Sequence, residues 1–164
     1  MSRQTCEHNK GGSDVKIRSK YFHDIEYEPS DILRFPNGLF GFEGEHEFLL
    51  LPFAGSEGTL LCFQSVQTPA LAFVAVNPFS LRPDYAPELS EGELRLLGVT
   101  CSQDLCFYAL CVVREPVGES TVNLKCPIAV NDNLREAMQV ILDTDKYHMR
   151  HRLSDLHKEG AAQC

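Results

Sequence analysis

Short stretches in which apolar and polar residues alternate mark the first part of the chain. Residues 15–18 and 25–28 switch between apolar and charged side chains with a period of two, which indicates strands with one buried face. Further short runs rich in apolar residues and bounded by Pro, Gly, Ser or Asn predict more strands; the last of them could also be helical. These are residues 32–35, 47–51, 60–65, 70–76, 105–113, 121–124, 128–130 and 138–142.

Few segments favour helix. Ser90 followed by Glu93 and an apolar run is a capping-box pattern, so we predict a helix from residue 90 to 97 that Gly98 closes. Residues 77–87 contain three prolines and are predicted to be irregular. Residues 147–153 are basic and rich in histidine, and they could form a second short helix that frays into a polar tail.

A glycine-rich loop follows the third predicted strand. Residues 35–44 contain three glycines and one proline, which predicts turns with positive φ. Large apolar residues are interleaved with the glycines, so we expect the loop to pack onto the core.

About ten short strands with one or two short helices predict an all-β fold, a mainly antiparallel small barrel or sandwich. The length of 164 residues suits one domain. We expect a single domain over residues 13–153, between a disordered tail at residues 1–12 and a flexible C-terminal tail at residues 154–164.

Cysteine usage favours a reducing compartment. The chain has seven cysteines, an odd number, and Cys62, Cys106 and Cys111 lie in apolar runs where cysteine behaves as a small hydrophobic residue. No secretory signal and no apolar stretch of membrane-spanning length is visible. We therefore predict a cytoplasmic protein that does not bind membranes.

Charge is distributed unevenly. Residues 21–97 contain twelve acidic side chains and three arginines, a net charge of −9 in a chain whose total is −8. Such a surface repels phosphate backbones and attracts basic proteins, so direct nucleic-acid binding is disfavoured. The same charge could simply aid solubility.

Catalytic and metal-binding patterns are weak. Cys101, Cys106 and Cys111 are spaced by five, which places neighbours on opposite faces of a strand, and His148 with His151 has no third ligand nearby in the sequence. No nucleophile, phosphate-binding or dinucleotide motif occurs. We predict no catalytic residue, no metal ion, no cofactor and no small-molecule substrate.

Aromatic residues in irregular segments are candidate contacts for a protein partner. Phe79 follows Asn77-Pro78, and Tyr85 follows Asp84. We expect Phe79 to be tucked under its loop, whereas Tyr85 could be either buried or exposed.

Four segments together resemble one known family. Phe35-Pro36-Asn37-Gly38-Leu39-Phe40-Gly41-Phe42-Glu43 is similar to an F-P-x-G-L-P-G-F-E loop, and Asn77-Pro78-Phe79 with Pro83-Asp84-Tyr85 is similar to N-P-F…P-D-Y. Residues 122–131 resemble V-N-L-x-A-P-I-x-x-N, and residues 139–151 resemble Q-x-I-L…Y…R-H. In this order, over about residues 15–153, they resemble the FliW family of flagellar assembly factors. Two departures stand out: Phe40 replaces a proline, and Cys126 replaces a small residue.

The resemblance implies a compact β-barrel and two protein partners: flagellin, and CsrA, a basic RNA-binding repressor of flagellin translation. Members of the family relieve that repression when they bind CsrA, and flagellin sequesters them. The residues we predict to contact partners are Asn77, Phe79, Asp84, Tyr85, Glu88, Glu91, Glu93, Asn123 and Asn131.

Two other interpretations stay open. A small-ligand or nucleotide-sensing barrel would use the glycine-rich loop as a lid, but would need a basic cluster at the barrel mouth, which Arg34 alone does not supply. The second of these interpretations is a cysteine-dependent redox enzyme.

Overall fold

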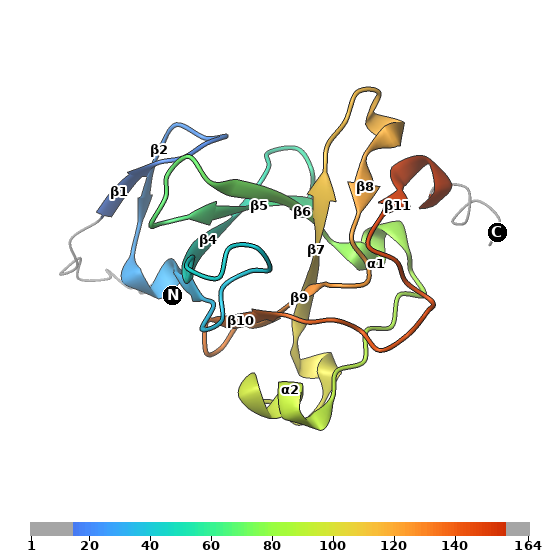
Figure 1. Ribbon diagram of the computed structural model, residues 1–164. Helices are drawn as coiled ribbons and strands as arrows, with labels where there is room; N and C mark the ends of the chain where they lie inside the picture. Colours follow the sequence, from blue (N-terminus) through green and yellow to red (C-terminus); the bar gives the residue numbers. More distant parts are fainter. Residues whose placement is uncertain (1–14, 157–164) are drawn as a thin grey trace, which may run out of the picture.

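Seven strands join edge to edge into a closed ring (Figure 1). The computed structural model describes residues 15–156. The ring runs β3–β4–β5–β6–β7–β9–β10 and back to β3, so these strands close on one another and expose no long sheet edge. Its members are β3 (Leu33–Arg34), β4 (Glu47–Pro52), β5 (Leu60–Ser65), β6 (Ala72–Val76), β7 (Cys106–Val112), β9 (Ile128–Asn131) and β10 (Glu136–Gln139).

The strand pairs are antiparallel except at one place, the seam where the barrel closes. Strands β10 and β3 are parallel and share a single residue pair, Glu136 opposite Arg34. The Arg34 amide also donates to the Arg135 carbonyl at 2.9 Å. The predicted all-β, mainly antiparallel fold is confirmed, and the barrel is the correct alternative.

Aromatic side chains fill the barrel. Phe35 lies edge-on to Phe48 and Phe63, with ring centroids 5.1 and 6.0 Å apart, and all three are fully buried. Burying one such side chain contributes about 1.5–3 kcal/mol, so this cluster is a large part of the driving force for closure.

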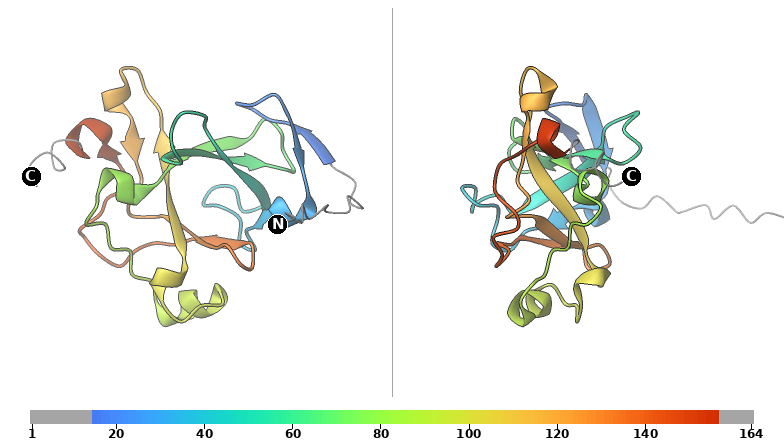
Figure 2. Two further views of the ribbon diagram at one scale, coloured as in Figure 1. Left: turned by 180° about the vertical axis from the view of Figure 1, so that it is seen from behind. Right: turned by 90° about the vertical axis from the view of Figure 1, so that its right-hand side faces the viewer.

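Two short strand pairs flank the ring at opposite ends (Figures 1 and 2). The hairpin of β1 (Val15–Arg18) and β2 (Asp24–Tyr27) packs on the barrel through Ile17, Tyr27 and Leu49. A fully buried Gln64 side chain accepts a hydrogen bond from the Lys20 amide and so fixes the hairpin. At the other end, β8 (Thr121–Val122) pairs with β7 and with β11 (His151–Arg152).

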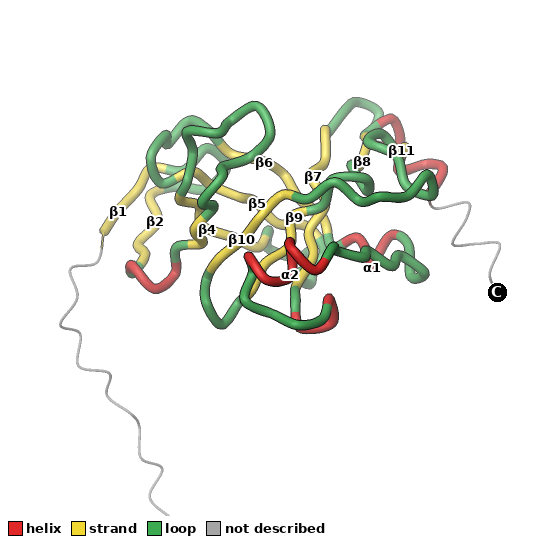
Figure 3. Tube along the Cα trace, turned by 60° about the horizontal axis from the view of Figure 1, so that its bottom comes forward, coloured by secondary structure: helices red, strands yellow, loops and turns green. Residues whose placement is uncertain are grey.

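Short helices lie outside the strands (Figure 3). The predicted helix at Ser90 is confirmed as α2 (Glu91–Leu96). The Ser90 hydroxyl accepts from the Glu93 amide, the Glu93 carboxylate accepts from the Ser90 amide, and Gly98 ends the helix with φ +73°. Single 3₁₀ turns occupy Pro29–Asp31, Ser102–Asp104 and Val117–Glu119.

The prediction that residues 77–87 are wholly irregular is wrong. They contain α1 (Pro78–Leu81), because proline is tolerated in the first helical turn and the Asn77 side chain caps the Phe79 amide at 3.0 Å. The remainder of the segment, after Arg82, contains neither helix nor strand.

The helix predicted over residues 147–153 is also wrong. The His148 carbonyl accepts hydrogen bonds from the amides of Leu124 and Lys125, and the Leu153 amide donates to the Ser120 carbonyl. Long-range pairing therefore uses the backbone groups that a helix would need. Residues 153–156 are helical and Leu156 is buried. Both predicted tails otherwise lie outside the described residues.

The glycine-rich loop contains a tight turn at its centre. The Phe42 amide donates to the Leu39 carbonyl at 2.8 Å, Gly41 has φ +83°, and Phe40 has a negative φ. This is a type II turn, in which the position of Phe40 favours proline and that of Gly41 requires positive φ. Phenylalanine at residue 40 is therefore compatible with this turn.

We expect Gly38→Ala to lower the free energy of unfolding by about 2–4 kcal/mol, measured by urea denaturation. Gly38 has φ +66°, and an added Cβ would lie 2.6 Å from the Phe42 carbonyl oxygen and 2.7 Å from Glu43 backbone atoms. Gly41→Ala is the matched control, because it shares the positive φ but meets no atom within 4 Å; it should cost about 1 kcal/mol. Equal losses for the two variants would contradict the close approach at Gly38.

Candidate partner-binding site

Three of the predicted contact residues lie around one hollow of about 450 Å³, here called the Phe79 hollow. Phe79 is 40% exposed, so the expectation that it is tucked under its loop is wrong. Pro78, the first residue of α1, takes the buried position instead. The residues around the Phe79 hollow are Phe79, Tyr85, Ala86, Pro87, Glu88, Ser102, Gln103, Leu105 and Phe107.

Tyr85 forms the floor of the Phe79 hollow. Only 4% of the residue is exposed, its hydroxyl donates to the Leu124 carbonyl at 2.8 Å, and its ring meets that of Tyr147 at 4.7 Å. Burial raises the pKa of Tyr85 well above its usual value. Phe79 rests edge-on against Tyr85 at 5.7 Å and Phe107 at 6.4 Å, so a rigid aromatic base presents it to solvent.

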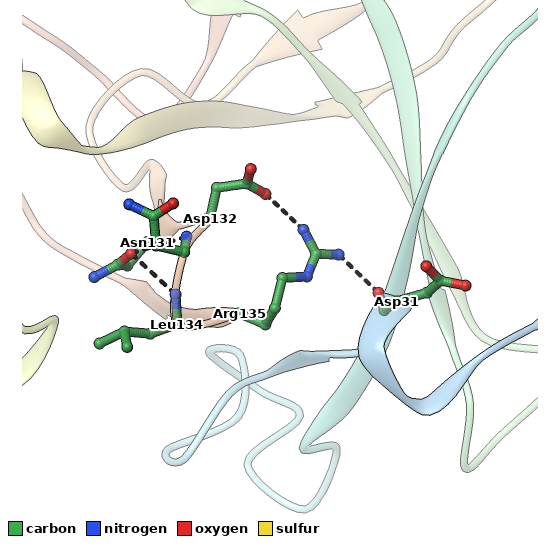
Figure 4. A network of polar contacts seen from close by, with 6 residues as sticks. Asp31, Asn131, Asp132, Leu134 and Arg135 are labelled. Carbon is green, nitrogen blue, oxygen red and sulfur yellow. Dashed lines mark hydrogen bonds and ion pairs between the residues drawn. The ribbon is translucent and has the colours of Figure 1, made fainter. Parts of the chain in front are cut away.

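The three predicted asparagines shape loops. Asn77 caps α1, and the Asn123 side chain accepts from the Cys126 amide at 2.9 Å. Asn131 is buried; its amide group donates to the Leu97 carbonyl at 2.8 Å, and its oxygen accepts from the amides of the turn that follows, including that of Leu134 (Figure 4). Asn131 therefore joins α2 to the barrel.

The same turn is tied to the start of the barrel. Figure 4 shows the guanidinium of Arg135 between the Asp132 carboxylate at 2.6 Å and the Asp31 carbonyl at 2.7 Å. These bonds reinforce the parallel seam between β10 and β3.

The acidic candidates divide into two groups. Glu88 and Glu91 are exposed and lie at the Phe79 hollow and at the start of α2. Asp84 forms an ion pair with Arg82 at 3.3 Å, and Glu93 completes the capping box. Of these four candidates, Glu88 and Glu91 are therefore the more available to a basic partner.

A second hollow, of about 420 Å³, lies between the glycine-rich loop and residues of β6, β7, β8 and β10, and it is here called the mouth groove. Phe73 and Leu110 reach it from the barrel core, and Phe40 borders it from the glycine-rich loop. Among the predicted contacts, only Asn123 lies here. The mouth groove is lined by Phe40, Phe73, Val74, Leu110, Cys111, Val112, Thr121, Asn123, Cys126, Gln139, Met149 and Arg150.

Hydrogen bonds fix the floor of the mouth groove. The Gln139 side chain accepts from the Phe40 amide at 2.9 Å and donates to the Cys126 carbonyl at 3.2 Å. The Cys126 amide in turn donates to Asn123. Three chain segments far apart in sequence are thus held in one arrangement.

Three of the thiols are poorly suited to nucleophilic chemistry. Burial raises the pKa of Cys62 to about 11, and it also raises the pKa values of Cys111 and Cys126. Cys106 is exposed, contrary to the expectation that it is a buried hydrophobic residue. Within residues 15–156, no three His, Cys, Asp or Glu side chains gather in a group that could hold a metal ion. In the same part of the chain, no helix has the length and apolar character to span a bilayer.

Comparison with known proteins agrees with the sequence motifs. The model of the FliW protein family matches residues 16–153. The flagellar assembly factor FliW of Geobacillus sp. (strain WCH70) is 42% identical over 139 residues, which cover 85% of this chain and 95% of the relative. The chain belongs to the FliW family. The flagellar assembly factor FliW of Shouchella clausii (strain KSM-K16) is 35% identical over 146 residues, 89% of this chain and 99% of that one.

A solved FliW structure shares the fold. The crystal structure of a flagellar assembly factor FliW matches with a TM-score of 0.78 and 41% identity, covering 85% of this chain and 96% of the other. Three of the four FliW motifs noted in the sequence converge in space, because Phe40, Asn123, Gln139 and Arg150 border the mouth groove. Phe79 and Tyr85 of the other motif border the Phe79 hollow.

Most residues of the mouth groove were missed as contacts in the sequence. Gln139 and Arg150 do lie in segments that resemble the FliW motif, and that was the available signal. Their spatial meeting with Phe40 depends on closure of the barrel, which no local spacing reveals.

We expect Gln139→Leu to lower the free energy of unfolding by about 1–3 kcal/mol, because it leaves the Phe40 amide and the Cys126 carbonyl without their bonds to that side chain. Hydrogen–deuterium exchange should also become faster at the Phe40 amide. Gln103→Leu, at an exposed position, is the control and should change stability by less than about 0.5 kcal/mol. Unchanged exchange at Phe40 would show that Gln139 does not hold the loop.

Proposed function

We propose that this chain is a flagellar assembly factor that acts in the cytoplasm by exchanging two protein partners, flagellin and the repressor CsrA, without a chemical step. Binding of CsrA would relieve repression of flagellin translation, and accumulating flagellin would restore it by sequestering the chain. The observation that carries the proposal is the match to FliW relatives over 95% or more of their length.

The surface supports a binding role. Phe79 is an exposed aromatic side chain on a rigid base, and exposed aromatic residues are frequent anchors in protein interfaces. The mouth groove adds a second preformed hollow. Its described lining contains a single ionised side chain, Arg150, which does not favour a nucleotide-sensing module.

Charge offers a rationale for the CsrA contact. Glu88 and Glu91 lie beside the Phe79 hollow and in α2, within the acidic part of the chain. Attraction to a basic partner would accelerate encounter, and negative potential next to an RNA site would oppose phosphate binding.

Gel filtration of purified proteins tests the proposal. We expect the chain to comigrate with flagellin and with CsrA when each is mixed with it alone. Flagellin added in excess should release CsrA from the preformed complex, because the proposal requires exchange. An equally acidic unrelated protein serves as the control for charge. If the chain comigrates with neither partner, the proposed function is wrong.

The charge contact is tested by reversing Glu88 and Glu91 to lysine. Glu93 is left intact because it caps α2. The association rate with CsrA should fall by roughly three- to tenfold at low salt and become less salt-sensitive, as measured by stopped-flow fluorescence. Glu57→Lys with Glu119→Lys makes the same change in net charge at exposed positions elsewhere and should have a smaller effect. Equal effects of the two double variants would show that only total charge matters.

A further inference from the structure

Exposed apolar side chains gather at the mouth groove. Phe40 is 51% and Met149 is 56% exposed, and the exposed Val112 lies with them around the same hollow of about 420 Å³. Single exposed hydrophobic residues are ordinary on a protein surface, whereas several around one hollow indicate a contact with another molecule. The volume lies within the range of 300–1,000 Å³ that is typical of binding pockets.

The mouth groove is also preformed. The hydrogen bonds of the Gln139 side chain with the Phe40 amide and the Cys126 carbonyl fix its floor. The ring of Phe73 packs against that of Phe48, with ring centroids 6.2 Å apart. A site that is ordered before binding loses little conformational freedom on association, so its apolar area contributes more fully to affinity.

The charge at the mouth groove selects the kind of occupant. Arg150 is exposed and is the one ionised side chain among the described residues that line it. A basic segment would meet repulsion there, whereas a carboxylate would be attracted and could accept paired hydrogen bonds from the guanidinium. The occupant should therefore combine apolar side chains with a neighbouring acidic group.

The Phe79 hollow has the opposite character. It carries Glu88, lies next to acidic α2, and shares no lining residue with the mouth groove. A basic partner is suited to the Phe79 hollow, and a partner that presents apolar and acidic groups is suited to the mouth groove. Two partners of different charge can thus be recognised by two different surfaces.

We propose that the mouth groove binds an apolar, carboxylate-bearing segment of a protein partner, with Phe40 and Met149 as apolar contacts and Arg150 paired to the carboxylate. The inference rests on the proposed function, in which the partner that is not the basic repressor is flagellin. The groove then determines flagellin binding, and the acidic surface near α2 determines CsrA binding.

The experiment compares four variants of the full chain by isothermal titration calorimetry against flagellin and against CsrA. Met149→Asp places a carboxylate among the apolar contacts and should weaken flagellin binding at least about tenfold. Arg150→Gln should weaken it by roughly three- to tenfold and reduce its salt dependence. CsrA affinity should stay within twofold for both variants.

Matched controls separate the mouth groove from general effects. Ile141→Asp makes a comparable change at a residue that is also 56% exposed but does not line the groove, and Arg114→Gln removes an exposed arginine elsewhere. Both should bind each partner as the unsubstituted chain does. Circular dichroism melting of all four variants verifies that each is folded, and Arg150→Gln remains informative if Met149→Asp is unstable.

The outcomes distinguish this inference from the proposed function. If the unsubstituted chain binds neither partner, both are wrong. If it binds both partners and the groove variants bind flagellin normally, the inference alone is wrong. Loss of CsrA binding in the groove variants, or equal losses in the controls, would also overturn it.

Discussion

The parallel seam between β10 and β3 closes the barrel, and the other features of the molecule depend on that closure. The seam is held by one residue pair, by the hydrogen bond from the Arg34 amide to the Arg135 carbonyl, and by the contacts of the Arg135 guanidinium. Parallel pairing across so few residues is weak in itself, and burial of the aromatic cluster around Phe35 adds to the stabilisation of the closed barrel. With the seam closed, the glycine-rich loop that follows β3 lies beside the end of β10.

That proximity explains how the two hollows acquire their shapes. The loop reaches Gln139 because β3 and β10 are neighbours, and the mouth groove lies where Phe40 of the loop meets residues of β6, β7, β8 and β10. The Phe79 hollow forms on the outside, where the chain leaving β6 as α1 packs against Phe107 of β7. One closed sheet thus supports an apolar surface with an arginine and an aromatic surface with glutamates.

Local signals predicted local structure well. The helix at Ser90 needs only a serine, a glutamate three residues later and an apolar run, all visible in the sequence. Features set by distant contacts were not predictable in this way. The exposure of Phe79 and the burial of Tyr85 follow from the packing of Tyr85 on Tyr147, sixty-two residues later in the chain, and the strand at His151 follows from pairing with Val122. The sequence identified Asn123 but not the groove it borders, because Gln139 and Phe40 meet only in the folded barrel.

In the type II turn at Leu39–Phe42, the path of the backbone depends little on which side chain residue 40 carries. The family motif has proline where this chain has phenylalanine, and both residues fit that corner of the turn without altering its path. A different side chain at residue 40 would therefore change the chemistry at the rim of the mouth groove while the backbone of the loop keeps its path.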